Sequence, residues 1–222
     1  MTSRFHDRHD AGRKLAALLS RYANDPWVIV LALPRGGVPV AVEVARKLGA
    51  PLDILTVRKL GVPGQEELAM GAVASGGVRV LDDGLIRDFG VTERAIEQTT
   101  EREQQELTRR ERLYRGDHPF PELNDRIVII VDDGLATGAT MRAAILAVRR
   151  QQPRRIVVAA PVGSRYVCDA LGRIADESVC AATPIGFQAV SEYYDDFGQT
   201  TDAEILELLR TMPNNPFPTP RS

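Results

Sequence analysis

An alternation of short apolar runs with helical patterns constrains the fold of this chain more than any other feature. Five runs rich in β-branched residues predict strands, at residues 28–33, 53–57, 127–131, 156–160 and 178–182. Because each run is almost wholly hydrophobic, we expect these strands to be buried on both faces of a parallel sheet. Helical patterns separate them, so the sequence predicts an α/β fold: an open, mostly parallel, twisted sheet of about five strands with helices on both faces.

Other segments depart from this alternation. Residues 72–75 and 78–81 flank Gly76-Gly77, which predicts a β-hairpin that extends one edge of the sheet. Residues 92–115 are dense in Glu, Arg and Gln and predict a long, solvated helix whose charges belong to the surface rather than to a site. Near the end, Thr201 and Glu204 fit a capping box ahead of a last helix.

Length and composition narrow the class of protein. The 222 residues suit one main domain, which we expect over residues 1–212, followed by a loose tail at 213–222. A net charge of −2 argues against a nucleic-acid partner. Nothing resembles a signal peptide or a membrane span of about 18 apolar residues, so a cytoplasmic protein without a membrane partner is expected. Cys168 and Cys180 predict small buried thiols in a reducing compartment, not a disulfide or a zinc site.

The most informative segment is residues 128–140, VIIVDDGLATGAT, in which a buried strand leads through two aspartates into a turn of small residues and then a helix. Ligands of open parallel sheets bind at the carboxyl ends of strands. Backbone N–H groups in such a turn, together with the dipole of the following helix, attract an anion. The sequence therefore predicts a phosphate loop made of Gly134, Leu135, Ala136, Thr137, Gly138, Ala139 and Thr140.

Asp132 and Asp133 would oppose phosphate binding unless they face something else, because like charges repel at close range. Ribose hydroxyls and a hydrated Mg²⁺ would satisfy them, and a sugar diphosphate supplies both. An ordinary polar turn is the plainer alternative. Other phosphate motifs do not fit: the Gly-Lys-Ser/Thr of a Walker A loop and the three spaced glycines of a dinucleotide site are missing, and a haloacid-dehalogenase-type phosphatase would need Asp where Gly134 stands.

Residues 128–141 resemble the phosphoribosyl diphosphate (PRPP) signature of the type I phosphoribosyltransferases, and within that family the adenine-type version with its Leu-Ala-Thr-Gly run. The resemblance implies a type I fold with a small hood or C-terminal element. It implies that Asp132 and Asp133 contact the ribose hydroxyls and bind Mg²⁺, through water, while residues 136–140 wrap the 5-phosphate. It also makes a homodimer a reasonable expectation.

Two further segments fit this resemblance. Arg35, Gly36 and Gly37 follow the first strand and resemble the pyrophosphate loop of the family, with glycine N–H groups and a guanidinium aimed at phosphate oxygens. Arg58 and Lys59 precede residues 60–67, a stretch of loop formers that resembles the mobile catalytic loop, so both are candidate catalytic residues. A tight turn and a solvated basic pair are the structural alternatives.

An aromatic cluster over residues 193–197, with Tyr193, Tyr194 and Phe197, either borders the acceptor or forms a small satellite core; we favour the core. The histidines His6, His9 and His118 are expected to face solvent.

The expected function is Mg²⁺-dependent transfer of 5-phosphoribosyl from PRPP to a nitrogen acceptor, such as a nucleobase, with release of pyrophosphate, as in nucleotide metabolism. Family members that act on hypoxanthine or guanine carry an acidic residue where this chain has Ala136, which argues against a 6-oxopurine acceptor. A regulatory module that binds PRPP without turnover is the main alternative, and an Mg²⁺-dependent phosphatase a weaker one. The sequence does not name the acceptor.

Overall fold

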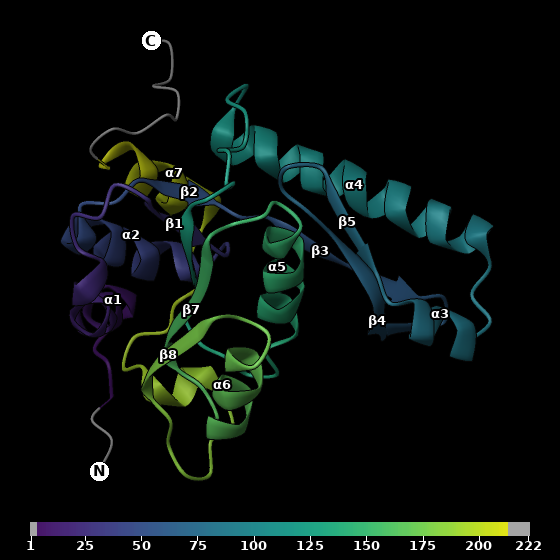
Figure 1. Ribbon diagram of the computed structural model, residues 1–222. Coiled ribbons are helices and arrows are strands. Elements are labelled where there is room, and N and C mark those ends of the chain that lie inside the picture. Colours follow the sequence, from purple (N-terminus) through teal and green to yellow (C-terminus); the bar gives the residue numbers. More distant parts are fainter. Residues whose placement is uncertain (1–3, 213–222) are drawn as a thin grey trace.

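Five strands form one parallel sheet (Figure 1). The computed structural model describes residues 4–212, so the expected loose tail lies outside the described residues. The strand order is β2-β1-β6-β7-β8, and every neighbouring pair is parallel. These strands are β1 (Val28–Ala32), β2 (Leu52–Ile54), β6 (Ile127–Val131), β7 (Arg155–Val162) and β8 (Glu177–Ala182). The predicted sheet is confirmed.

Helices cover both faces of this sheet. In β6, Ile129 and Val131 belong to one apolar core and Val128 and Ile130 to the other, as the two-residue period of a strand requires. The first core includes side chains of α1 (Arg8–Leu18), α2 (Gly37–Leu48) and α7 (Asp202–Arg210). The second includes side chains of α5 (Ala139–Arg149) and α6 (Arg165–Gly172). Burial on both sides explains why the strands are hydrophobic throughout.

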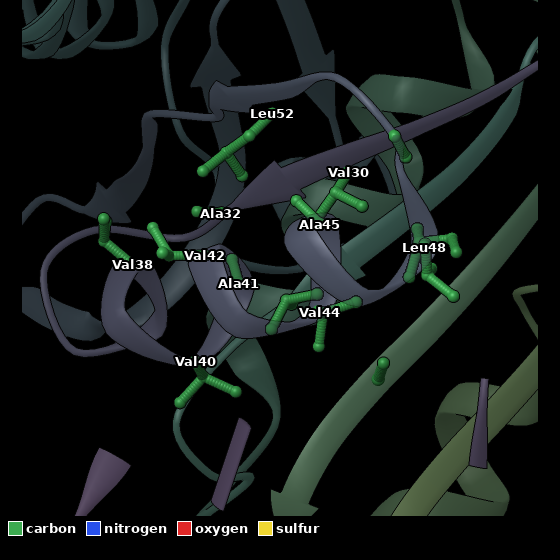
Figure 2. Close-up of a cluster of buried hydrophobic side chains, with 14 of the residues drawn as sticks. Val30, Ala32, Val38, Val40, Ala41, Val42, Val44, Ala45, Leu48 and Leu52 are labelled. Carbon is green, nitrogen blue, oxygen red and sulfur yellow. The ribbon is translucent and has the colours of Figure 1, made fainter. Parts of the chain in front are cut away.

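Helix α2 anchors the first core (Figure 2). Its Val42, Ala45 and Leu48 are buried with Val30 and Leu52 of the neighbouring strands. Burying a Val or Leu side chain contributes about 1.5–3 kcal/mol, so this helix stabilises the part of the sheet formed by β1 and the edge strand β2. The helix ends at Gly49, whose φ of 65° is a left-handed conformation that glycine adopts without strain.

The predicted hairpin exists, but it does not extend the main sheet. Strands β3 (Val57–Val62), β4 (Gln65–Ala74) and β5 (Val78–Leu81) form a separate antiparallel sheet of three strands. Gly76 and Gly77 have the positive φ values expected of the turn. The edge prediction is wrong because Leu60, Val62 and Met70 pack with Ile96 and Leu107 in a core of their own instead of lying beside β2.

The long charged helix is confirmed as α4 (Glu93–Arg115), preceded by the short α3 (Asp83–Asp88). Figure 1 shows α4 running along the three-stranded sheet. Most of its charges are solvated as predicted, but Arg115 is buried: its Nη2 lies 3.0 Å from Asp53 Oδ1 and donates to the Ile54 carbonyl at 2.6 Å. The surface assignment is therefore wrong for Arg115, which ties the end of α4 to β2.

Short elements complete the chain. Two 3₁₀ helices, η1 (Ser20–Tyr22) and η2 (Val190–Tyr193), lie in connections. The predicted capping box at the start of α7 is present, with Glu204 N donating to Thr201 Oγ1 and Thr201 N to Glu204 Oε2. Within the described residues, none of the helices combines the length and the apolar character that crossing a bilayer demands.

The two cysteines form a disulfide, with their Cα atoms 6.5 Å apart. The prediction of separate thiols is wrong, and the reducing compartment inferred from it loses that support. Cys168 lies on α6 and Cys180 on β8. The chain turns back after α6, and α6 then packs against the strand that follows it, which brings residues twelve positions apart side by side.

Candidate functional site

Two glycine-bearing segments meet at the carboxyl ends of β1 and β6. The two strands are neighbours, and Leu33 N donates to the Val131 carbonyl at 2.9 Å. A Cβ atom added to Gly36 would lie 1.9 Å from Asp133 Oδ2, and one added to Gly37 would lie 2.7 Å from the Val131 carbonyl oxygen. Side chains at these two positions would therefore separate the segments. The predicted pyrophosphate loop therefore packs directly against the acidic pair.

The two aspartates are partly buried and held in fixed orientations. Asp133 N donates to Asp132 Oδ1 at 2.9 Å, and Arg8 Nε donates to Asp133 Oδ2 at 2.8 Å. Burial raises the pKa of Asp132 well above its ordinary range, and the charge of Asp133 adds to this effect. Burial also raises the pKa of Asp133, against the opposing effect of Arg8. Oδ2 of Asp132 and Oδ1 of Asp133 have no side-chain partner among the described residues, so they are available to a ligand.

The phosphate loop rests on one apolar anchor. Leu135 is buried, and its N–H donates to the Val162 carbonyl at 2.8 Å. Gly138 has φ 73° and lies against Val167 of α6, which a Cβ atom at this position would approach to 2.7 Å. Ala136, Thr137 and Thr140 are exposed above the anchor. Gly138 precedes α5 without a side-chain cap. Ala139 N donates to Thr137 Oγ1 at 3.3 Å, and the N–H groups that follow it in the first turn are available to an anion.

The basic residues differ from the prediction. Arg58 and Lys59 lie inside β3, and residues 60–67 form the β3–β4 hairpin, so the expected irregular loop is wrong. Pro63 and Gly64 form its turn, and their presence concealed the strand pattern on either side. Arg58 is engaged by α4: its Nη2 lies 2.7 Å from Glu103 Oε2.

Lys59 is placed differently from Arg58. Its side chain lines a cavity of about 360 Å³ together with Ala139 and Arg142 at the start of α5. No ion pair or side-chain hydrogen bond joins Lys59 to another residue of the described part of the chain. Of the two predicted catalytic residues, Lys59 is therefore the one that lies beside the phosphate loop. Arg35 is exposed next to Gly36, and none of the side chains that the structure describes forms an ion pair with it.

Comparison with known proteins shows the family of this chain. The phosphoribosyl transferase domain family matches residues 1–176. The chain belongs to that family. Two Mycobacterium tuberculosis proteins, from strains CDC 1551 and H37Rv and provisionally named phosphoribosyl transferases, are each 48% identical to it over 206 residues, or 92% of this chain. The chain spans about half the length of these relatives, because the match covers 46% of each.

A solved structure shares the fold of this phosphoribosyl transferase domain. The crystal structure of TT1426 from Thermus thermophilus is 41% identical in sequence and superposes with a TM-score of 0.82. The likeness covers 93% of this chain and 97% of that one. The predicted family and fold class are therefore confirmed.

The phosphoribosyl transferase domain also contains two contacts with Asp133 that the sequence did not indicate. Tyr194 is buried in a small core with Phe5, which confirms the satellite core, yet its Oη donates to the Asp133 carbonyl at 2.6 Å. Arg8 comes from an N-terminal segment that the sequence presents only as polar. These two contacts join residues 61 and 125 positions apart, so no local pattern could have signalled either of them.

Proposed function

We propose that this domain transfers the 5-phosphoribosyl group of PRPP to a nitrogen nucleophile and releases pyrophosphate. The observation that carries the proposal is the contact between Gly36 and Asp133. The contact brings the glycine loop after β1 against the two carboxylates after β6, and the chain then leads to the N-terminus of α5. PRPP carries a pyrophosphate, ribose hydroxyls and a 5-phosphate, which would match these three parts in the same order. Membership of the phosphoribosyl transferase family supports the same donor.

Each part of PRPP has a matching group in this arrangement. The 5-phosphate would accept hydrogen bonds from the loop over residues 136–140, beside the N-terminus of α5. The ribose hydroxyls would bond the two available oxygens on Asp132 and Asp133. The pyrophosphate would lie against the N–H groups of Gly36 and Gly37, with Arg35 as a charged donor.

The acidic pair also fits a magnesium ion. Its available oxygens are hard ligands, and Mg²⁺ in proteins is commonly bound by one or two carboxylates together with water and ligand phosphates. Asp132 and Asp133 would hold the ion, through water. When bound, Mg²⁺ would neutralise charge on the pyrophosphate.

In the proposed reaction the bond between the anomeric carbon and the pyrophosphate oxygen breaks, and its electron pair leaves with pyrophosphate. The acceptor nitrogen bonds to the anomeric carbon from the opposite face and loses its proton to solvent. Lys59 and Arg35 would stabilise the charge on the departing group, which is where fixed cations lower the barrier. Asp132 and Asp133 would orient the ribose rather than transfer protons.

One observation favours a second candidate, a module that binds PRPP without turnover. Arg58, expected to be catalytic, is occupied by Glu103. Against this candidate, Lys59 remains beside the phosphate loop. The phosphatase alternative loses ground because a side chain at Gly134 would meet Val190, 2.4 Å from a Cβ atom, so the required second carboxylate has no room there.

The decisive experiment has two arms. Calorimetry with PRPP and Mg²⁺ measures donor binding, and release of pyrophosphate is then followed with a panel of nucleobases and other nitrogen acceptors. We expect donor binding and release with at least one acceptor. Tight binding with no release on any acceptor would establish the binding module, and an absence of donor binding would exclude both candidates. Release of inorganic phosphate from PRPP or from simple phosphate esters would instead support the phosphatase.

A further inference from the structure

We infer that Arg8 is a positioning residue that holds the Asp133 carboxylate in the orientation needed for the donor. The inference rests on the proposed function. Arg8 Nε donates to Asp133 Oδ2 at 2.8 Å, and the two side chains are only 12% and 16% exposed. A charge-assisted bond that is shielded from water to this extent is stronger than a surface ion pair.

The Arg8 guanidinium is itself held from several sides. Its Cζ lies 4.0 Å from the ring centroid of Phe197, in a cation–π contact, and its Nη1 donates to the Gly198 carbonyl at 2.7 Å. The segment that contains Phe197 and Gly198 therefore holds the guanidinium in place. Any rotation of Arg8 away from Asp133 would give up the Phe197 and Gly198 contacts together.

The place of Arg8 in its helix argues for a specific role. Arg8 is the first residue of α1, directly after the N-cap Asp7. A positive charge at a helix N-terminus is unfavourable because that end of the helix dipole is also positive. The bonds to Asp133 and Gly198 offset this cost, so the contacts rather than helix stability account for an arginine at this position.

Arg8 leaves one oxygen of Asp133 available. Oδ2 is confined between the guanidinium and Gly36, while the main-chain carbonyl of Asp133 accepts from Tyr194 Oη. With the carboxylate and the backbone both fixed, Oδ1 has a defined direction for a ribose hydroxyl. The guanidinium also offsets negative charge beside a loop that must receive phosphates, so it lowers repulsion between the aspartates and the donor.

Removing Arg8 should therefore weaken donor binding. In Arg8→Gln the Asp133 carboxylate can rotate and its charge is unopposed, and we expect about tenfold weaker PRPP affinity, of the order that loss of one charged hydrogen bond causes. Arg8→Lys keeps the charge but loses the fork that reaches both Asp133 and Gly198, so it should restore part of the affinity. Arg13→Gln, an exposed change on the same helix, is the matched control and should leave the affinity unchanged.

The test is calorimetry of PRPP and Mg²⁺ binding to the wild type and to these variants, with thermal unfolding measured in parallel. A double-mutant cycle with Asp133→Asn separates positioning from general damage to the fold. If Arg8 acts through Asp133, the tenfold effect of Arg8→Gln shrinks to less than about twofold in the Asn background. An effect of equal size in both backgrounds would overturn the inference, as would unchanged affinity in Arg8→Gln. If the wild type itself fails to bind PRPP, the proposed function and the inference both fail.

Discussion

Gly36 lies against Asp133 so closely that no other residue type fits at this position without movement. A Cβ atom there would stand 1.9 Å from Asp133 Oδ2 and 2.5 Å from its Cγ. The same oxygen accepts the hydrogen bond from Arg8. The contact therefore sets the distance between the glycine loop after β1 and the acidic pair after β6.

We expect Gly36→Ala to weaken PRPP binding by at least about tenfold, because the new methyl group forces Asp133 away from Arg8. Calorimetry measures the affinity. Gly84→Ala, in the short helix α3 where the nearest atom is 3.3 Å from the added Cβ, is the control and should bind the donor normally. Equal affinities in wild type and Gly36→Ala would mean that the contact does not shape the donor site.

Asp132→Asn should stabilise the donor-free protein at neutral pH while weakening donor binding. Burial and the charge of Asp133 raise the pKa of Asp132 in the folded state, so the native protein holds this proton more tightly than the unfolded chain. The contribution of protonated Asp132 to stability is fully present below the unfolded-state pKa of about 3.9. It is lost as pH rises through the folded-state pKa of Asp132.

The free energy of unfolding of Asp132→Asn should therefore exceed that of the wild type as pH rises above about 4. The difference should be complete above the folded-state pKa of Asp132 and amount to about 1.4 kcal/mol for each unit by which that pKa is raised. Urea unfolding of both proteins from acid to neutral pH, without PRPP or Mg²⁺, measures the difference. A wild type that is more stable than the variant at neutral pH would contradict the expected sign.

The neighbours Arg58 and Lys59 should respond differently to the same substitution. Lys59→Gln removes a cation beside the phosphate loop, so it should lower turnover by about 10²-fold with a smaller effect on stability. Arg58→Gln breaks the pair with Glu103 and should mainly destabilise the protein, by about 1 kcal/mol.

Turnover is measured with the acceptor found in the pyrophosphate-release screen, and stability by urea unfolding. The two variants serve as controls for each other. If Arg58→Gln lowered turnover as strongly as Lys59→Gln without destabilising the fold, the predicted difference between the two residues would be contradicted.

Arg115→Met should destabilise the protein by about 3–5 kcal/mol, because it leaves the buried Asp53 carboxylate without its counter-charge. Burial already raises the pKa of Asp53, and Arg115 is the main group that opposes this. Arg112→Met, at an exposed position in the last turn of α4, is the control and should change stability little. A similar loss in both variants would show that α4 depends on helix-end charge rather than on the buried pair.

Contiguous residues were enough to predict the parallel strands, the turn at Gly76-Gly77, the capping box at Thr201 and the loop after Asp133. Each of these depends on local physics. A buried strand must be apolar on both faces, a left-handed turn favours glycine, and a helix N-terminus needs a cap within three residues. The family could be identified from the same kind of signal, because its donor loop is one unbroken segment.

Contacts between distant segments decided the rest. Packing against α4 explains why β3, β4 and β5 form a separate sheet. The same helix carries Glu103, which forms an ion pair with Arg58. Packing of α6 against β8 joined Cys168 to Cys180. The fold brings the N-terminal helix beside the loop after β6, so that Arg8 contacts Asp133, which lies 125 positions later in the sequence. Such pairings depend on which surfaces pack together in the folded protein, so they cannot be predicted from a residue's neighbours in the sequence.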